Sequence, residues 1–286
     1  MSKKILVICA TGKVGVELVK LLNESGEKIK AVSREPLSAS KKFSAPVETI
    51  KFDFDTPETF VPALNEVDRV FLMARPGDNE SDKAAIPFID EAKKKGIKHI
   101  VNLTAMGAET DDNFMLRRLE KYIESSGIPY THLRPNWFMQ NFNSGPMYAD
   151  IKYTGALHLP AGDAKVSFID VRDIAAAGVS VLKNEKHFGE AYTLTGNESI
   201  NHFEVVEILS GVSNKKISYI PISDETARAS LKQAGAAAGQ IERWSNFFQK
   251  VREGFCSGVS EDIISLINHP PITFQKYAEH YAAWWN

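Results

Sequence analysis

The chain opens with a glycine-rich turn whose spacing suits the phosphates of a dinucleotide. An apolar run over residues 5–8 predicts a buried strand before the turn, and an amphipathic pattern predicts a helix after it. In this context Gly12 lets the backbone approach a pyrophosphate, and Gly15 lets the helix pack closely on the sheet. The first N–H groups of the helix supply further hydrogen bonds to phosphate. We therefore predict a dinucleotide site at this turn, which consists of Ala10, Thr11, Gly12, Lys13, Val14 and Gly15.

A cysteine, Cys9, occupies the position that usually carries the first glycine of a three-glycine fingerprint. We interpret it as a small packed thiol at the end of the strand rather than as a redox group. Its side chain stands where the turn is tightest, which could lower the affinity for the cofactor.

The residues after the second predicted strand bear on the choice between NAD and NADP. An acidic residue there would hold the ribose 2′-OH, whereas an arginine accommodates a 2′-phosphate. Arg34 lies 19 positions after Gly15, and Lys13 adds a second positive charge nearby. A charge-assisted bond to phosphate favours NADP(H) over NAD(H). The alternative is a solvated Arg34 paired with Glu35, whose carboxylate could also repel the phosphate.

The composition is that of an ordinary globular protein. Hydrophobic residues make up 43% of the 286 positions, charged residues make up 24%, and the net charge is -2. We therefore expect no general attraction to nucleic acid or to an anionic membrane. Two cysteines offer no disulfide framework, the first strand follows the start directly, and no apolar run approaches membrane-spanning length. These features predict a cytoplasmic protein.

His132 and His158 lack companions at metal-ligand spacing, so we predict no metal.

Strands and helices alternate through the first half, which is typical of parallel βαβ units. We predict an α/β fold: a Rossmann-type doubly wound parallel sheet with a smaller, mainly helical C-terminal substrate lobe. Residues 1–135 would form the NADP-binding core and residues 136–286 the substrate lobe, with residues near 164–195 returning to the core. The predicted strands are residues 5–8, 29–33, 48–52, 69–73, 99–103, 130–134 and 191–194, and the predicted helices include residues 56–64, 82–95, 116–125 and 171–182.

Two helix boundaries carry specific signals. Asn201 with Glu204 three places on has the spacing of a capping box. Thr56 before Pro57 has the pattern of an N-cap followed by a proline in the first turn. Residues 136–162 form a long irregular insertion, and residues 223–286 are predicted to be mainly helical.

Several segments beyond the glycine turn carry a family resemblance. They are residues 127–142 (GIPYTHLRPNWFMQNF), 159–163 (LPAGD), 166–175 (VSFIDVRDIA) and 268–274 (NHPPITF). With them the chain resembles the short-chain dehydrogenase/reductase superfamily in its atypical NmrA-like branch, which includes triphenylmethane and quinone reductases as well as proteins that bind the dinucleotide and report on it. The resemblance spans nearly the whole chain.

The resemblance implies further cofactor contacts at the strand ends. It sets Met73, Ala74 and Arg75 against the riboses and Asp53 near the adenine. Asp53 could equally be a turn residue at the strand end. The additional cofactor-binding residues that we expect are Asp53, Met73, Ala74, Arg75, Thr104, Asn136 and Trp137.

The superfamily's usual proton donor is absent from its expected place. Most members carry Tyr-x-x-x-Lys after the fifth strand, but residues 113–120 (NFMLRRLE) contain no tyrosine. Tyr148 and Lys152 have the same spacing, but they lie in the insertion, and we interpret them as a chance match. Thr104 and Asn141 are left as the candidate catalytic residues, since Thr104 matches the position of a serine that contacts a carbonyl substrate. The alternative for Thr104 is a plain β-branched strand end.

Without this acid, a ketone is a poor acceptor, because its reduction needs a proton donor or strong oxyanion stabilisation. A quinone, an iminium ion or a dye-like cation spreads the incoming charge by conjugation, so that the protein need only bind and orient the partners. Aromatic residues after the sixth strand suit such flat ligands, although they could equally be packing residues. The predicted substrate contacts are Trp137, Phe138, Asn141, Phe142, Tyr148 and Tyr153.

The sequence thus predicts an NAD(P)H-dependent oxidoreductase, with NADPH preferred, that transfers hydride to an aromatic, quinonoid or iminium-like small molecule without a Tyr/Lys relay. The alternative is an NADP(H)-binding redox sensor that has no turnover and acts through a protein partner. A homodimer is one assembly open to the chain.

Overall fold

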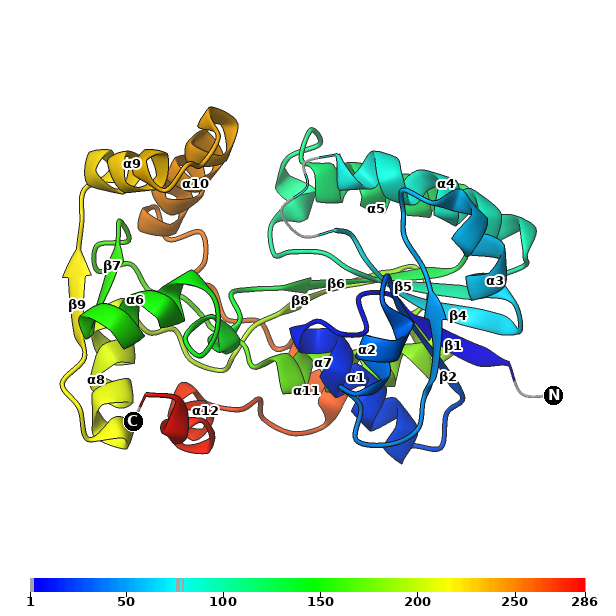
Figure 1. Ribbon diagram of the computed structural model, residues 1–286, viewed down its shortest axis with the longest axis horizontal. Coiled ribbons are helices and arrows are strands. Elements are labelled where there is room, and N and C mark those ends of the chain that lie inside the picture. Colours follow the sequence, from blue (N-terminus) through cyan, green and yellow to red (C-terminus); the bar gives the residue numbers. More distant parts are fainter. Residues whose placement is uncertain (1–2, 76–77, 79, 286) are drawn as a thin grey trace. The chain divides into compact units, whose positions relative to one another are not determined.

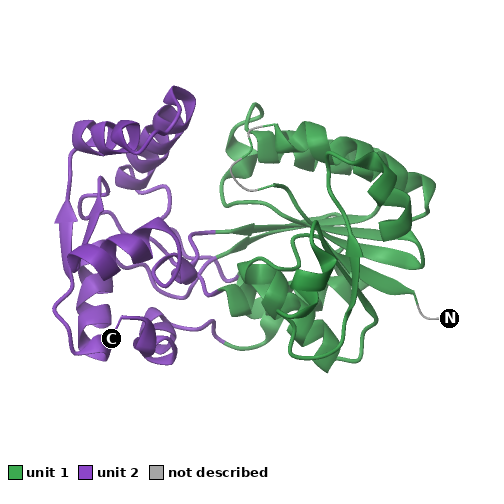
Figure 2. Cartoon of the chain, in the orientation of Figure 1, with its two compact units in different colours: residues 1–135, 171–194, 262–269 green, residues 136–170, 195–261, 270–286 purple. Residues whose placement is uncertain are grey.

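A computed structural model describes residues 3–75, 78 and 80–285. The chain divides into two compact units, which Figure 2 shows in green and purple. Unit 1 comprises residues 1–135, 171–194 and 262–269, and unit 2 comprises residues 136–170, 195–261 and 270–286.

Unit 1 is built on a seven-stranded sheet with the order β3-β2-β1-β4-β5-β6-β8, in which all neighbouring strands are parallel. This is the doubly wound arrangement that the alternating pattern predicted, and the order reverses between β1 and β4. The strands are β1 (Lys4–Val7), β2 (Ile29–Ser33), β3 (Glu48–Lys51), β4 (Val67–Met73), β5 (His99–Leu103), β6 (Tyr130–Pro135) and β8 (Glu190–Leu194).

Helices cover both faces of this sheet (Figure 1). One face carries α4 packed against α5, and the other carries α1 packed against α7, with α11 beside α7. The core follows from the period of two along each strand, since Leu6 and Ile8 join the cluster beneath α4, which contains Phe88 and Ile89. The helices of unit 1 are α1 (Lys13–Glu24), α2 (Pro36–Ser40), α3 (Phe60–Leu64), α4 (Ser81–Lys94), α5 (Met115–Ser126), α7 (Val171–Leu182) and α11 (Asp262–Ile267).

Unit 2 contains a small parallel sheet of β7 (Ala156–Leu159) and β9 (Ser218–Pro221). Its core is aromatic: Phe142 and Phe168 are buried, and Phe274 packs edge-on against Phe142. The helices are α6 (Pro146–Thr154), α8 (His202–Ser213), α9 (Asp224–Gln233), α10 (Ala238–Arg252) and α12 (Phe274–His280).

Both predicted helix starts lie where the sequence set them, but only one of them has the side-chain cap. At the start of α8, the Asn201 side chain accepts from the Glu204 N–H and the Glu204 carboxylate accepts from the Asn201 N–H, which is the predicted capping box. Thr56 is the N-cap residue and Pro57 stands in the first turn, as predicted, but Thr56 makes no side-chain cap hydrogen bond, and the segment opens with a short 3-10 helix (Pro57–Thr59) that leads into α3. Within this turn the hydrogen bond comes from the Thr59 hydroxyl, which donates to the Thr56 carbonyl.

The predicted lobe of residues 136–286 also differs from unit 2 in one segment. Helix α11 clusters with unit 1, because it packs against α7 and β8, and the Asp262 carboxylate accepts a hydrogen bond from the Thr193 N–H. Within the described residues, no helix has the length and apolar character needed to cross a membrane.

Candidate functional site

The glycine turn is held by close backbone contacts. The Gly12 N–H donates to the Cys9 carbonyl at 2.9 Å, and Gly12 is the N-cap of α1 without a side-chain cap. A Cβ atom added to Gly15 would lie 2.3 Å from the Cys9 oxygen and 2.8 Å from the Ala10 Cα, so only glycine fits there. The first turn of α1 therefore rests directly on the backbone at the end of β1. This geometry suits a pyrophosphate.

Cys9 adopts a left-handed backbone conformation with φ of 56°. The first fingerprint position thus keeps a glycine-like backbone although it carries a side chain, at a cost of about 1 kcal/mol. The thiol packs inward and donates to the Met73 carbonyl at 3.7 Å, and burial raises its pKa. A protonated, inward-facing thiol agrees with the packing interpretation of Cys9.

The parallel sheet brings most of the predicted cofactor residues of unit 1 to one edge. Arg34 follows β2, Asp53 follows β3, Ala74 and Arg75 follow β4, and Thr104 follows β5. In open parallel sheets, ligands bind at the carboxyl ends of the strands near the reversal of strand order, which here lies between β1 and β4.

Acidic side chains surround Arg75 at this edge. Its Nη2 lies 2.9 Å from Asp55 Oδ1 and 3.9 Å from Asp53 Oδ1, and its Nη1 lies 3.6 Å from Asp78 Oδ2. The hydrogen bond from Arg75 lowers the pKa of Asp55, and the charge of Arg34 adds to the effect. Asp53 Oδ1 also accepts from the Asp55 N–H at 3.1 Å, which is the turn role that we kept as the alternative for Asp53.

Arg34 is exposed, and the ion pair with Glu35 that we kept as its alternative is not formed between the two described side chains. The Glu35 N–H donates to Ser33 Oγ at 3.1 Å, which fixes the backbone just after β2. Arg34 therefore stands at the predicted position with its guanidinium open to solvent.

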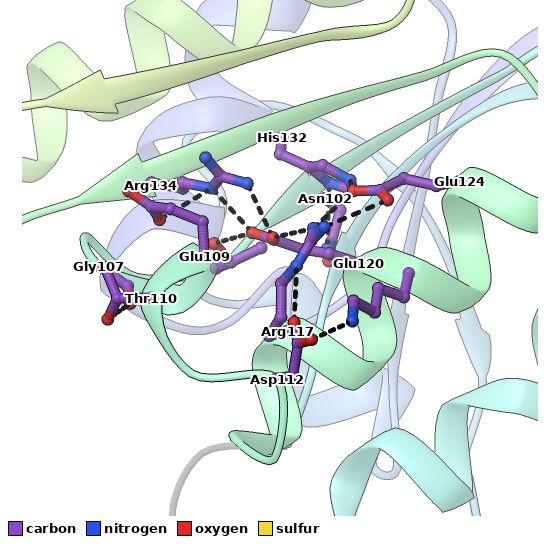
Figure 3. Close-up of polar contacts among 12 residues, drawn as sticks. Asn102, Gly107, Glu109, Thr110, Asp112, Arg117, Glu120, Glu124, His132 and Arg134 are labelled. Atoms are coloured by element: carbon purple, nitrogen blue, oxygen red, sulfur yellow. Dashed lines mark hydrogen bonds and ion pairs between the residues drawn. The ribbon is translucent and has the colours of Figure 1, made fainter.

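Thr104 is not available as a simple hydroxyl at the end of β5. Its Oγ1 donates to Glu120 Oε1 at 2.9 Å, and Glu120 is fully buried. Arg134 donates from Nε to Glu120 Oε1 at 3.0 Å and from Nη2 to Oε2 at 2.8 Å, and Arg117 Nη1 reaches Oε2 at 2.9 Å. Figure 3 shows Arg117 and Arg134 converging on the carboxylate of Glu120. We call Thr104, Arg117, Glu120 and Arg134 the Glu120 cluster.

Burial alone would raise the pKa of Glu120, but the hydrogen bonds and charge of Arg134, together with the other partners, outweigh it, so the pKa lies below its ordinary value. The carboxylate is thus ionised at neutral pH and only accepts hydrogen bonds. Glu120, Glu124 and His132 lie close enough to share a metal ion, since their nearest donor atoms are within 4.8 Å of one another. However, Arg117 and Arg134 already bond to the oxygens of Glu120, and Arg117 Nη1 is 2.6 Å from Glu124 Oε1. The carboxylates are therefore neutralised by guanidinium groups.

The tyrosine of α5 does not replace the missing proton donor. Tyr122 donates its hydroxyl to Asp90 Oδ1 at 2.5 Å, and this hydrogen bond raises the pKa of the phenol. A phenol poised for acid–base work needs the opposite shift, towards neutral pH.

The remaining predicted contacts lie in unit 2. Asn136 is buried and uses its amide structurally: Nδ2 donates to Ser167 Oγ at 2.8 Å and to the Cys256 carbonyl at 2.9 Å, while Oδ1 accepts from the Trp137 N–H. Trp137 is half-buried, with its ring stacked on Phe247 at 5.1 Å between centroids.

Phe142 requires a correction, because it is fully buried among the core rings of unit 2 and presents no surface to a ligand. Phe138 and Asn141 are half-buried. Tyr148 and Tyr153 share α6, but Tyr153 is 81% exposed, whereas Tyr148 donates to the Trp284 carbonyl at 3.3 Å.

With this geometry in place, the family can be assigned. A model of the NmrA-like family matches residues 1–266. The chain belongs to this family. It is 32% identical to an NAD(P)H azoreductase of Xenophilus azovorans over 98% of both chains. It is 31% identical to prestalk A differentiation protein A of Dictyostelium discoideum over 96% of this chain and 91% of that protein. It superposes on the triphenylmethane reductase of Citrobacter sp. complexed with NADP(H) with a TM-score of 0.81 and 26% identity, over 98% of this chain and 99% of that one.

The sequence interpretation missed the Glu120 cluster apart from Thr104. A signal was present, because Arg117, Glu120 and Glu124 follow one another at spacings of three and four on a predicted helix, where they share one face. Their partner Arg134 lies on β6, and only the folded sheet brings this strand to that face of α5.

Proposed function

We propose that this chain is an NADPH-dependent reductase that transfers hydride to a flat aromatic, quinonoid or iminium-like acceptor. An NAD(P)H-dependent reductase is supported by the azoreductase and triphenylmethane reductase relatives, each matched over nearly the whole chain. The observation that carries the proposal is the turn itself, where the start of α1 lies so close to β1 that Gly15 admits no Cβ.

The residues of unit 1 fit a dinucleotide. The turn from Ala10 to Gly15 would hold the pyrophosphate with backbone N–H groups, and the exposed guanidinium of Arg34 would pair with the 2′-phosphate. Met73 and Ala74, at the end of β4, would contact the riboses. NADPH, when bound, supplies the hydride, and the protein supplies position and charge.

The Glu120 cluster argues for an acceptor that needs no proton from the protein at the moment of hydride transfer. The Thr104 proton is donated to an ionised carboxylate, and that carboxylate has no proton to give. A conjugated acceptor spreads the negative charge that hydride brings, or loses a positive charge, and so reacts without a general acid. We propose Trp137, Phe138 and Asn141 as acceptor contacts, and we leave Phe142 out.

The test is turnover by the full chain with NADPH and a panel of quinones, cationic triphenylmethane dyes and azo dyes, followed by the loss of absorbance of the reduced nicotinamide. We expect turnover of at least one class and little with simple ketones. Absence of turnover across the panel, with NADPH binding retained, would count against the reductase.

A second candidate is an NADP(H)-binding sensor, favoured by the absence of a tyrosine in residues 113–120 and by the relative that is named for differentiation rather than for a reaction. A sensor would retain a protein partner to a different extent with NADP+ and with NADPH. Equal retention in both forms would remove this candidate.

A further inference from the structure

Unit 2 contains a cavity of about 470 Å³ that the dinucleotide chemistry does not use. It lies among α6, the segment that leads into β9, and a 3-10 turn near the C-terminus (Ala282–Trp284). We call it the lysine–tryptophan groove. Its lining residues are Tyr148, Ile151, Lys152, Gly155, Lys215, Lys216, Ile217, Ala283, Trp284 and Trp285.

The charge of the groove has one sign. Lys152, Lys215 and Lys216 line it, and no described aspartate or glutamate does. All three lysines are exposed, and none forms an ion pair with a described acidic residue. Three ammonium groups around one hollow attract an anion.

The other wall is aromatic. The rings of Tyr148 and Trp284 meet edge to face at 5.6 Å between centroids, and the Tyr148 hydroxyl donates to the Trp284 carbonyl. Trp284 is 49% exposed, which is unusual because contact with water is unfavourable for so large an apolar side chain. The next residue, Trp285, is buried and donates from Nε1 to the Phe142 carbonyl at 2.8 Å, which anchors this wall to the core.

Tyr148 and Lys152 both line this groove, and the Tyr148 hydroxyl donates to a backbone carbonyl. Lys152 Nζ lies 5.4 Å from the centroid of the Tyr148 ring, over its face, while the hydroxyl faces the Trp284 carbonyl. The ammonium is therefore placed to attract a ligand, with the ring supporting it by a cation–π contact.

We propose that the lysine–tryptophan groove binds a flat aromatic anion, a carboxylate or sulfonate. The ring of the ligand would lie against Trp284 and Tyr148, and its anionic group would meet the ammonium groups of Lys215 and Lys216. The volume suits a small molecule of one or two rings. All lining residues belong to unit 2 and none to the glycine turn, so this site does not depend on the proposed reductase activity.

Isothermal titration calorimetry of the full chain with 2-naphthoate tests the proposal, with 2-naphthamide as the uncharged counterpart. We expect 2-naphthoate to bind about tenfold more tightly than the amide, and its affinity to fall as salt is raised. The double variant Lys215→Glu/Lys216→Glu should weaken 2-naphthoate binding by about tenfold or more, because attraction becomes repulsion. Trp284→Ala should weaken both ligands, while the hydrogen bond from Tyr148 persists because it ends on the backbone.

The matched control is Lys165→Glu/Lys232→Glu, which makes the same change of charge at two exposed lysines of unit 2 that do not line the groove. Its affinity for 2-naphthoate should stay within about twofold of the parent. The circular dichroism spectrum and thermal midpoint establish that each variant is folded. If 2-naphthoate fails to bind, or binds the groove variants as tightly as the control, the proposal is wrong.

Discussion

Two regions at the same edge of the sheet have opposite construction. The glycine turn after β1 is made of backbone packed on backbone, and no side chain caps the helix that follows. The Glu120 cluster after β5 and β6 is made of side chains, and its buried carboxylate accepts hydrogen bonds from a hydroxyl and two guanidinium groups. The first region leaves hydrogen-bonding capacity for a ligand, whereas the second uses its capacity within the protein. For the proposed reductase, this contrast predicts that the glycine turn serves cofactor binding and that the Glu120 cluster contributes little acid–base chemistry.

The largest effect is expected from Gly15→Val, because a Cβ at this position would meet the Cys9 oxygen at 2.3 Å. The helix must move away from β1, so we expect loss of NADPH binding and destabilisation of about 3 kcal/mol or more. Fluorescence titration with NADPH and urea unfolding measure the two effects. Gly211→Ala in α8 is the control, since its Cβ would meet nothing within 4 Å, and normal NADPH binding by Gly15→Val would refute the close-packing argument.

Next in size is Glu120→Gln, which removes the charge that two arginines share inside the Glu120 cluster. Breaking a buried ion pair commonly costs about 3 kcal/mol or more, so the free energy of unfolding in urea should fall by that amount. Glu80→Gln removes an exposed partner of Lys83 and should cost less than about 1 kcal/mol. Equal losses in the two variants would mean that the cluster is no better shielded than the surface.

Arg34→Ala tests whether the proposed cofactor site distinguishes NADPH from NADH. If the guanidinium pairs with the 2′-phosphate, NADPH binding should weaken by roughly 1.5 to 3 kcal/mol while NADH binding hardly changes. Lys13→Ala should weaken both cofactors if it serves the shared pyrophosphate, but only NADPH if it reaches the 2′-phosphate. If the parent protein binds NADH as tightly as NADPH, the proposed role of Arg34 is wrong, and Glu35 becomes the better candidate for a contact with the ribose.

The side chains around Glu120 should also make stability depend on pH. Burial lowers the pKa of His132 to about 4, so the unfolded chain binds a proton between about pH 6.5 and 4 that the folded chain does not. The stability contributed by neutral His132 is thus present above pH 6.5 and is lost as the pH falls towards 4. His132→Gln should remove a part of this loss of about 1 to 3 kcal/mol, measured by urea unfolding at pH 7 and 4.5. The matched control is His280→Gln, the same substitution at an exposed histidine of α12.

The smallest effect is expected for Thr104→Val on turnover. Its proton is already donated to Glu120, so kcat/KM with a quinone or cationic dye should change by less than about threefold, although stability should fall by about 1 kcal/mol. A general acid contributes roughly 100-fold or more, so a loss of that size would make Thr104 a catalytic residue and end the contrast between the two regions.

Much of unit 1 could be predicted from the sequence because its signals are local. Apolar runs predicted the strands, and the helices predicted over residues 82–95 and 116–125 end just before Gly96 and Gly127, which adopt positive φ. The capping box at Asn201 depends on residues three positions apart and was also predicted correctly. The family resemblance, carried by short contiguous segments, was confirmed over most of the chain.

Contacts between distant residues were decided by the tertiary structure. Glu120 and Arg134 are on a helix and a strand that become neighbours only when β6 joins β5, and Phe142 is buried only because Phe168 and Phe274 reach it from other segments. The packing of α11 against α7 and β8 likewise depends on segments far apart in the chain, and so does the lysine–tryptophan groove. The sequence by itself determined the strands, the capping box at Asn201 and the glycine turn, since these depend on neighbours along the backbone. Burial, and with it the charge state of Glu120 and the exposure of Trp284, depends on which segments exclude water together, and only the packed fold decides that.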